Sequence, residues 1–358
     1  MDFIIISEFY VFCKNCRAGI SVTGEMHNAG PSKLRHFLPV LRTIFFTRPD
    51  FIGIIILKNG AAFPGAYRER DGTIMYKIVC KKELNASVTY MEIEAPFVAR
   101  KAKAGQFIIF RIDEKGERVP LTIAGYDREK GTVSIIFQKV GLSTNMLGQM
   151  NEGDYIQDFV GPLGKPTEVE GVKRVCVVGG GVGCAIAYPS AKAFKEAGAE
   201  VDVIIGFRNK DIVILEDEFR AASDNLYLMT DDGSYGEKGF GTVKLQQLLE
   251  SGIQYDEVLA IGPIPMMKFV AKTTEPFGVK TIVSLNPIMV DGTGMCGGCR
   301  VTVGGEVKFA CVDGPDFDGH QVDFAELMNR NGVYREREAE TNQTHMCRME
   351  KLGKDLIK

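Results

Sequence analysis

The chain has no apolar run long enough to cross a membrane and no secretory leader pattern. Among its 358 residues, the uninterrupted apolar stretches are short, far below the roughly 20 residues that a transmembrane helix needs. The apolar beginning at Phe3–Ile6 lacks the basic start and the small-residue cleavage site of a signal peptide. The sequence therefore predicts a cytoplasmic protein with no membrane association.

The chain also lacks a strong charge excess and a disulfide framework. It carries 43 Lys and Arg against 46 Asp and Glu, a formal net charge of -3, and no basic tract that would favour nucleic acid or an anionic surface. Its nine cysteines are scattered except near the C-terminus, unlike the framework of small secreted proteins. These absences favour a reducing compartment and no nucleic-acid partner.

One dense tract of potential metal ligands stands near the C-terminus. Asp291 begins the segment DGTGMCGGC, which contains Cys296 and Cys299, and Cys311 follows after eleven residues. Written as ligands, this is D-x4-C-x2-C-x11-C, whereas plant-type ferredoxins hold a 2Fe–2S cluster with C-x4-C-x2-C and a distant fourth cysteine. The spacing predicts that these four residues hold a 2Fe–2S cluster, with a carboxylate in place of the first thiolate.

The surrounding residues indicate how four such ligands could meet. Glycines would let the backbone approach the sulfides closely, and the tract has four of them, Gly292, Gly294, Gly297 and Gly298. The alternating runs Arg300–Val303 and Glu306–Ala310 flank a Gly-Gly pair and predict a β-hairpin that returns Cys311. A zinc site is the alternative, although zinc normally takes a second closely spaced Cys/His pair. Asp291 could also be only a turn residue.

Residues 75–167 have the pattern of a small antiparallel β-barrel. Turn residues separate short β-rich runs, which are Lys77–Cys80, Val88–Ile93, Gln106–Arg111, Val119–Ala124 and Thr132–Lys139. Two tracts of this barrel could bind a flavin. In the first, the Thr122 hydroxyl at a strand end could hydrogen-bond the reactive flavin nitrogen while Leu121 packs against the ring.

The second tract is Gly141-Leu-Ser-Thr, which leads into a predicted helix over Asn145–Met150. Backbone amides at a helix N-terminus, with the hydroxyls of Ser143 and Thr144, make a phosphate site. The alternative is that the Ser–Thr pair only caps the helix.

Residues 168–284 have the pattern of a nucleotide-binding α/β domain. An apolar strand over Val172–Val178 runs into Gly179-Gly-Gly-Val-Gly and then a helix over Ala185–Ala197, and Val201–Ile205 is the next strand of a βαβ unit. Glycines at such a turn let the backbone approach a pyrophosphate at the helix N-terminus. The alternative is a tight strand–helix corner.

Two later strands end at residues that would share the ligand-binding edge of this sheet. Leu226–Thr230 ends at Asp231, and Glu257–Ile261 ends at Gly262. The coenzyme choice is less defined, since Arg208 and Lys210 would favour NADP whereas the acidic run at residues 216–218 favours NAD. We expect NAD.

The order of these parts resembles the ferredoxin–NADP reductase superfamily and, within it, the iron–sulfur electron-transfer subunits of two-subunit flavoenzymes. The resemblance runs from Met75 to about Gly332. Among those subunits are the small subunit of NADH-dependent reduced ferredoxin:NADP oxidoreductase, whose first cluster ligand is an aspartate, and that of dihydroorotate dehydrogenase, whose loop has four cysteines. Asp291 favours the first kind.

The resemblance implies an antiparallel FAD-binding β-barrel, then a parallel-sheet NAD-binding domain, then a small 2Fe–2S cluster domain. It implies that FAD is bound by Arg118, Pro120, Leu121, Thr122, Gly141, Ser143 and Thr144, with Thr122 as the catalytic residue, and that NAD(H) is bound by Gly179, Gly180, Gly181, Gly183, Asp231 and Gly262. In one departure, Val119 stands where these flavoproteins place arginine, and Arg118 is one residue earlier.

The implied activity is hydride exchange between NAD(H) and FAD, followed by single-electron transfer through the cluster to a larger flavin and iron–sulfur subunit. That partner would bind ferredoxin and NADP. One alternative is the dihydroorotate dehydrogenase subunit, which passes electrons from dihydroorotate to NAD. Others are a stand-alone NADH:acceptor reductase and a noncatalytic redox sensor.

The predicted boundaries are 75–167 for the barrel, 168–284 for the nucleotide domain and 285–332 for the cluster domain, followed by a charged tail over 333–358. Residues 1–74 match none of these patterns, and we expect Met75 to be the native start. The alternative is a real N-terminal extension that caps the first domain. The pair Cys13 and Cys16 in this extension has no further ligands near it, so we expect no metal there.

Overall fold

The computed structural model describes residues 10–13, 43–48, 51–56, 67–70 and 73–344, and the chain divides into two compact units, Met1–Gly65 and Ala66–Lys358. The described part of the first unit is an antiparallel sheet in the order β1-β3-β2, made of β1 (Tyr10–Cys13), β2 (Thr43–Arg48) and β3 (Phe51–Ile56). Cys16 lies outside the described residues, so the expectation for the Cys13–Cys16 pair is not addressed. No helix of the described chain has both the length and the apolar character needed to traverse a bilayer.

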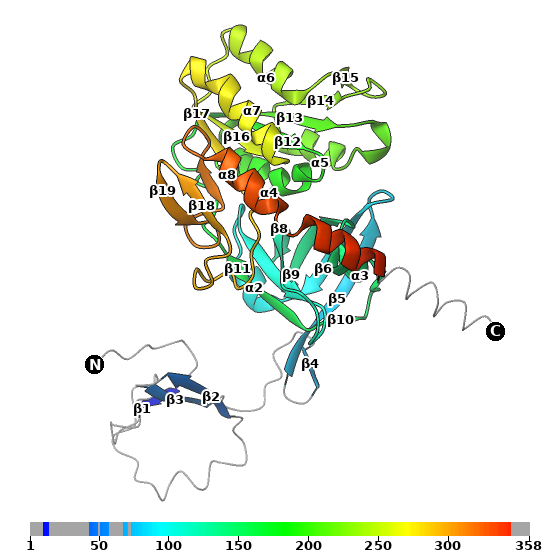
Figure 1. The fold of residues 1–358 in the computed structure, drawn as a ribbon, viewed down its shortest axis with the longest axis vertical. Helices are drawn as coiled ribbons and strands as arrows, with labels where there is room; N and C mark the ends of the chain where they lie inside the picture. The colour runs from blue at the N-terminus through cyan, green and yellow to red at the C-terminus, as the bar shows by residue number, and fades with distance from the viewer. Residues whose placement is uncertain (1–9, 14–42, 49–50, 57–66, 71–72, 345–358) are drawn as a thin grey trace, which may run out of the picture. The chain divides into compact units, whose positions relative to one another are not determined.

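The second unit begins with an antiparallel β-barrel, shown in cyan and green in Figure 1. The strands follow the order β10-β5-β6-β9-β8-β7-β11, and β4 pairs with β5. Their bounds are β4 (Tyr67–Arg70), β5 (Thr73–Glu83), β6 (Val88–Glu94), β7 (Phe107–Arg111), β8 (Val119–Asp127), β9 (Thr132–Gln138), β10 (Tyr155–Ile156) and β11 (Asp158–Leu163). The five predicted runs are β5 to β9, so the predicted barrel is confirmed.

The barrel contains a strand segment before Met75, and its helices differ from the sequence expectation. Strand β5 begins at Thr73 and pairs with β4, so the sheet includes residues before Met75. Helix α2 (Pro96–Lys101), which was not predicted, begins with a proline, a residue favoured in the first helical turn because its missing N–H is not needed there. Helix α3 (Leu142–Gln149) begins three residues before the predicted helix.

The nucleotide-type domain has the predicted, mostly parallel sheet, and helices cover both of its faces. Its order is β15-β14-β13-β12-β16-β17-β20, and only β20 runs antiparallel, against β17. The strands are β12 (Arg174–Gly180), β13 (Glu200–Phe207), β14 (Asn225–Thr230), β15 (Glu237–Lys238), β16 (Glu257–Ile261), β17 (Lys280–Ser284) and β20 (Asp316–Asp318). The central strands are apolar on both sides, as a doubly covered sheet requires.

Alternate residues of these strands pack into two separate cores. Val178 and Val258 join the core that contains Leu245 and Val270, whereas Val177 and Val203 join the core that contains Phe194. The helices therefore lie in two layers, α4 and α5 on one face and α6 and α7 on the other (Figure 1). Their bounds, with the two short 3-10 turns, are α4 (Gly183–Glu196), η2 (Lys210–Ile212), α5 (Glu216–Ala222), α6 (Gly241–Glu250), α7 (Ile264–Thr274) and η3 (Glu275–Phe277).

The C-terminal part contains the predicted hairpin. Strands β18 (Arg300–Val303) and β19 (Glu306–Phe309) pair around Gly304 and Gly305, whose φ values of 60° and 79° fit a two-residue turn that needs positive φ at both positions. The hairpin prediction is confirmed. Helix α8 (Phe324–Gly332) follows, and residues 335–344 are also helical.

Asp316 lies where the barrel, the nucleotide sheet and the C-terminal part meet. Its Oδ2 accepts a hydrogen bond of 2.9 Å from Thr167 Oγ1, which also lies 3.0 Å from Ser190 Oγ on α4. Its Oδ1 is buried and has no hydrogen-bond partner within the described chain. Burial raises the pKa of Asp316 to about 6, although hydrogen bonds from Ser284 and Thr167 act in the opposite direction. The raised pKa means that Asp316 stays protonated to a higher pH here than an exposed aspartate would.

This junction predicts a pH-dependent stability. Because the pKa of Asp316 in the folded chain is above its ordinary value, the group stabilises the fold below pH ~4, and that contribution is lost as the pH rises through about 6. Relative to an Asp316→Asn variant, the unfolding free energy of the natural chain should fall by up to about 3 kcal/mol between pH ~4 and ~7.

Chemical denaturation of both proteins across this pH range measures the difference. Asp318→Asn, on the same strand but with an exposed side chain, is the matched control and should follow the natural chain. Parallel pH profiles of the unfolding free energy for Asp316→Asn and the natural chain would contradict a raised pKa of Asp316.

Candidate functional site

The glycines after β12 form a close strand–helix corner at the point where the strand order reverses. A Cβ on Gly183 would lie 2.6 Å from Gly262 Cα and 2.6 Å from Ile261 O, so α4 can approach β16 only without a side chain there. Gly181 is different, because it has φ +57° and a Cβ on it would meet nothing within 4 Å. The corner therefore packs through Gly183 and leaves open space at Gly181, which fits a pyrophosphate at a helix N-terminus.

The other predicted nucleotide residues lie at the same carboxyl edge of the sheet. Asp231 follows β14, is exposed, and its backbone N–H donates to Phe207 O at the end of β13. Gly262 follows β16 and packs against Gly180. The structure thus brings Gly179 to Gly183, Asp231 and Gly262 to one edge, which is where ligands bind in open α/β sheets.

Tyr235, which was not singled out from the sequence, lies at this edge with Lys210 and Glu216, two residues that the coenzyme choice considered. The Tyr235 hydroxyl donates to Glu216 Oε1 at 3.3 Å, and Lys210 Nζ lies 5.4 Å from the centre of the Tyr235 ring. The hydrogen bond that the Tyr235 hydroxyl donates to Glu216 is the largest cause that raises the pKa of Tyr235. Lys210, a candidate for binding an NADP phosphate, therefore lies beside the Tyr235 ring, whose hydroxyl is bonded to Glu216.

The first flavin tract lies on β8, next to β7. Pro120, Leu121 and Thr122 pair with Ile109, Ile108 and Phe107, and Thr122 is half-buried. The strand is anchored by Ile123 N–H, which donates to Gln106 O at 3.0 Å. The predicted flavin-facing residues are thus held on a regular strand, as a rigid cofactor site requires.

At the second flavin tract the hydroxyls already have partners within the chain. Thr144 Oγ1 accepts from the N–H groups of Val140 and Gly141, each at 3.1 Å, and donates to Gly141 O. Ser143 Oγ donates to Glu117 Oε2 at 3.1 Å. Thr144 therefore acts as a helix cap, while a Cβ on Gly141 would meet nothing within 4 Å, so the turn has room for a phosphate.

Arg118 connects the barrel to the cluster loop. Its Nε donates to Val290 O at 3.1 Å, and its Nη1 lies 4.0 Å from Asp158 Oδ2. Val290 immediately precedes Asp291, so Arg118 contacts the backbone beside the first predicted cluster ligand. A role for Arg118 in binding FAD stays a prediction.

The three predicted cysteine ligands lie in one small region. Cys299 and Cys311 are buried at 2% and 1% exposure, whereas Cys296 is exposed. Burial is the main cause that raises the pKa of Cys311 to about 12, and a hydrogen bond with the Cys299 thiol acts in the same direction. No three His, Cys, Asp or Glu side chains of the described chain are arranged around one metal ion, whereas a 2Fe–2S cluster needs ligands on two irons.

Backbone N–H groups point at two of these sulfurs. Gly298 N–H donates to Cys296 Sγ and Cys311 N–H to Cys299 Sγ, both at 3.4 Å. Hydrogen bonds to ligand sulfurs are a recurring feature of iron–sulfur sites. The donor set and these bonds fit a 2Fe–2S cluster.

The Asp291 carboxylate has a structural role in the same loop. Its Oδ1 accepts from Thr293 N–H and its Oδ2 from Cys296 N–H, both at 2.9 Å. The hydrogen bond from Thr293 N–H is the largest cause that holds the pKa of Asp291 below its usual range, and the hydrogen bonds from Cys296 act in the same direction. The side chain thus folds the loop around its first cysteine, and its role as a ligand stays a prediction.

The loop over residues 286–299 contains no helix or strand and is held from outside. Three side chains donate to its carbonyls at 3.1 Å: Arg118 to Val290 O, Asn331 to Asn286 O, and Arg330 to Gly298 O. Arg330 and Asn331 follow the predicted ligands by 19 residues or more, and no local sequence signal marked them.

The cluster loop also packs directly on the barrel. A Cβ on Gly292 would lie 2.7 Å from Ile109 Cδ1 and 2.7 Å from Leu163 Cδ1, on β7 and β11. Ile109 belongs to the same buried core as Cys299 and Cys311. The predicted flavin strand β8 pairs with β7, so the loop and the flavin tract share a neighbouring strand.

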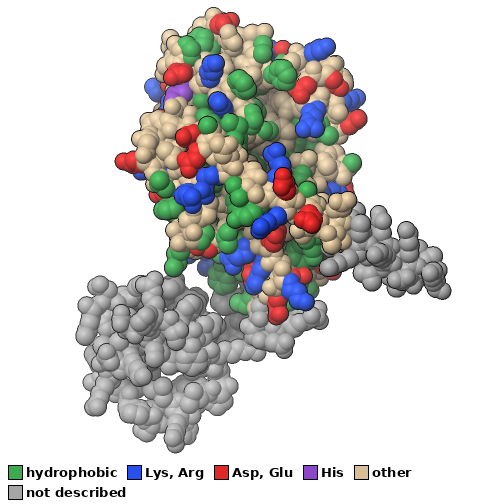
Figure 2. Space-filling model, viewed as in Figure 1, with side chains coloured by type: hydrophobic (Ala, Val, Ile, Leu, Met, Phe, Trp, Pro, Cys, Tyr) green, Lys and Arg blue, Asp and Glu red, His purple; other side chains and the backbone are tan. Residues whose placement is uncertain are grey.

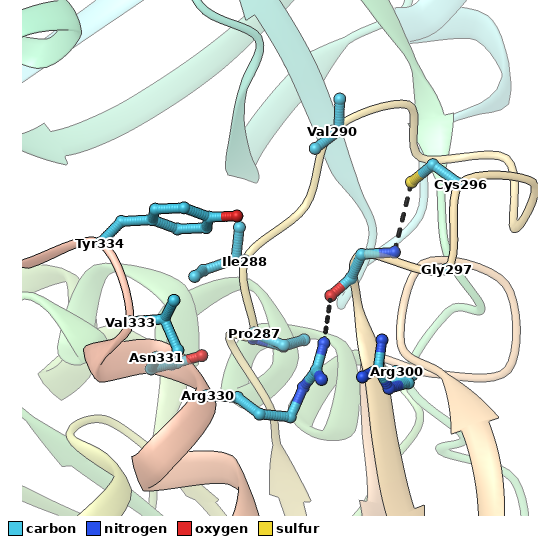
Figure 3. A pocket seen from close by; sticks show the side chains of 11 residues that line it. Pro287, Ile288, Val290, Cys296, Gly297, Arg300, Arg330, Asn331, Val333 and Tyr334 are labelled. Atoms are coloured by element: carbon cyan, nitrogen blue, oxygen red, sulfur yellow. Dashed lines mark hydrogen bonds between the residues drawn. The ribbon is translucent and has the colours of Figure 1, made fainter.

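A pocket of about 330 Å³ opens beside the exposed cysteine (Figure 3). Its lining includes Cys296, Arg300, Arg330 and Tyr334. Apolar side chains near it are exposed, with Met295 at 88% and Val333 at 67%. On the face seen in Figure 2, acidic and basic side chains are interspersed, with no extended area of one sign.

Comparison with known proteins places these features in one group of electron-transfer subunits. Residues 286–323 match the iron–sulfur cluster binding domain of dihydroorotate dehydrogenase B. A Clostridium beijerinckii protein known as the uncharacterized protein in the adh 3' region is 57% identical over 272 residues, which cover 74% of this chain and 92% of that protein.

Two further comparisons cover almost all of the matched protein. The dihydroorotate dehydrogenase B (NAD(+)) electron transfer subunit homolog of Thermotoga maritima is 49% identical over 267 residues, covering 75% of this chain and 94% of the homolog. A solved chain from the NADH-dependent reduced ferredoxin-NADP oxidoreductase, studied for flavin-based electron bifurcation, is 46% identical with a TM-score of 0.73, covering 78% of this chain and 100% of the solved chain.

The contact at Gly292 predicts that its side-chain size controls cluster binding. Gly292 and Gly305 have nearly equal φ values of +76° and +79°, but a Cβ at Gly305 would meet nothing within 4 Å. Gly305→Ala should lower the unfolding free energy by about 1–2 kcal/mol through backbone strain alone. Gly292→Ala should lower it further and reduce the iron content, because the Cβ would push the loop off the barrel.

Thermal unfolding and iron assays of the two variants measure this difference. Equal iron content in Gly292→Ala, Gly305→Ala and the natural chain would show that the close contact does not position the loop.

The Asp291 geometry predicts different results for two substitutions. Asp291→Cys supplies a thiolate in the ferredoxin spacing, so the cluster should be retained while its reduction potential shifts, because ligand identity sets the potential. Asp291→Asn retains one oxygen acceptor for the loop but not the charge, so it should bind less iron. Iron and sulfide content with a redox titration measure both effects. An unchanged potential in Asp291→Cys and full iron content in Asp291→Asn would make Asp291 a turn residue only.

Proposed function

The chain belongs to the family of dihydroorotate dehydrogenase B electron-transfer subunits and their homologs, and from this membership we propose that it is the NAD(H)-reacting subunit of a two-subunit flavoenzyme. It exchanges hydride between NAD(H) and FAD and passes single electrons through a 2Fe–2S cluster to a larger partner subunit. The observation that carries this proposal is the packing of the cluster loop at Gly292 on Ile109 and Leu163 of the barrel.

When bound, FAD supplies the conversion of a two-electron hydride into single electrons, and the cluster carries those electrons one at a time. Different residues of the chain would bind the nicotinamide dinucleotide and FAD. Gly181 and the start of α4 hold the nicotinamide dinucleotide at the open edge of the sheet, with Asp231 and Gly262 beside it. Thr122 and Leu121 on β8 would contact the flavin ring, and the open turn at Gly141 with the start of α3 would take its phosphates.

The buried Cys299 and Cys311 and the exposed Cys296 would hold the cluster, with Asp291 completing the ligand set. This arrangement keeps water from the side nearest the barrel, because both buried cysteines belong to the core that includes Ile109. The exposed Cys296 would lie on the side that is open to a partner subunit. We place the protein in the cytoplasm, where thiolate ligands stay reduced.

The partner is a larger subunit with its own flavin and iron–sulfur clusters, and ferredoxin and NADP act through it. Asp291 in the first ligand position favours this partner, and so does the full-length match to a chain of NADH-dependent reduced ferredoxin-NADP oxidoreductase. The second candidate is a dihydroorotate dehydrogenase partner, favoured by the naming of the Thermotoga maritima homolog.

Anaerobic affinity purification of the chain from its native cells, with mass spectrometry of every stoichiometric companion, tests the proposal. We expect a larger flavin and iron–sulfur subunit, with a complex whose flavin is bleached by NADH. A dihydroorotate dehydrogenase as the companion would select the second candidate. A chain that purifies alone and reduces soluble acceptors at full rate would contradict the need for a partner, and a chain that binds neither FAD nor iron would contradict the function itself.

A further inference from the structure

A single glycine links a helix outside the cluster loop to the exposed cysteine. Arg330 Nη2 donates to Gly298 O at 3.1 Å, and Gly298 N–H donates to Cys296 Sγ at 3.4 Å. Both bonds are drawn in Figure 3, where the guanidinium reaches the loop from the end of α8. Gly298 is thus held through both its carbonyl and its amide.

The helix that carries Arg330 is itself fixed. Asp323 caps its N-terminus by accepting from Glu326 N–H at 2.9 Å, and Phe324 and Leu327 are buried at 7% and 1% exposure. The next residue, Asn331, donates to Asn286 O at the opposite end of the same loop. Adjacent side chains of α8 therefore hold both ends of the cluster loop.

We propose that Arg330 is a positioning residue that orients the Gly298 amide toward Cys296 and raises the reduction potential of the cluster. The inference rests on the proposed function, because it requires a cluster ligated by Cys296. Two effects act in the same direction. A hydrogen bond to a ligand sulfur and a nearby positive charge both stabilise the more negative, reduced state.

Arg300 provides a matched control in the same pocket. It lines the pocket with Arg330 and lies beside it in Figure 3, but its side chain makes no hydrogen bond or ion pair within the described chain. Arg300→Gln therefore removes one positive charge near the loop without removing a bond to a loop carbonyl. Arg330→Gln removes both, and Arg330→Lys keeps the charge but loses the planar guanidinium that reaches Gly298 O.

The experiment is an anaerobic redox titration of the full chain, in which the electron paramagnetic resonance signal of the reduced cluster is the readout. Iron and acid-labile sulfide are measured on each sample. We expect Arg330→Gln to shift the potential to a more negative value than Arg300→Gln does. Arg330→Lys should lie between Arg330→Gln and the natural chain, because it restores the charge alone.

Equal shifts in Arg330→Gln and Arg300→Gln, or no shift in Arg330→Gln, would overturn the proposal. If Arg330→Gln binds no cluster, the pair Arg330→Lys and Arg300→Lys decides: a shift only in Arg330→Lys supports the positioning role, and equal potentials overturn it. A natural chain that binds no iron and sulfide would instead refute the proposed function, so the two failures are distinguishable.

Discussion

The close packing of the cluster loop on the β-barrel is the constraint on which the rest of the site depends. A Cβ on Gly292 would lie 2.7 Å from the terminal methyl groups of Ile109 and Leu163, so the loop backbone packs closely on side chains of β7, which pairs with the flavin strand β8, and of β11. Electron transfer between two bound groups requires them to be near each other, and this contact brings together residues that are remote in the sequence. The buried core continues from Ile109 to Cys299 and Cys311, which excludes water from the path between barrel and cluster.

The loop that makes this contact has no helix or strand of its own, and its order comes from side chains elsewhere in the chain. Arg118, Arg330 and Asn331 each donate to one of its carbonyls, while Asp291 accepts two N–H groups from within it. The three bonds from outside the loop are made to its carbonyls and not to the cysteine sulfurs. The same arrangement explains how a glycine-rich segment, which has high conformational entropy when unfolded, can present its thiols in a defined position.

Local patterns predicted the elements of this fold, whereas the contacts that assemble the site were not predictable. Alternating apolar residues and turn residues predicted β5 to β9, and the Gly304-Gly305 pair predicted the β18–β19 hairpin, because both depend on neighbouring residues. The Arg118–Val290 bond joins residues 172 positions apart, and no periodicity encodes such a partner. The capping role of Thr144 was weighed from the sequence and is observed. The ligand roles of Asp291 and the three cysteines, like the domain boundaries, stay predictions.

Strand β20 gives the C-terminal part a second role in the molecule. It pairs with β17 at the edge of the parallel sheet, with Ile282, Val283 and Ser284 opposite Asp318, Phe317 and Asp316. An uncovered β17 would present unpaired backbone groups and an apolar side to solvent, which is a template for aggregation. The iron–sulfur segment is therefore not a detachable module. A flavin reductase made by ending the chain after β17 would lose its edge protection together with its cluster, so gene fusions and truncations of this protein must preserve that strand.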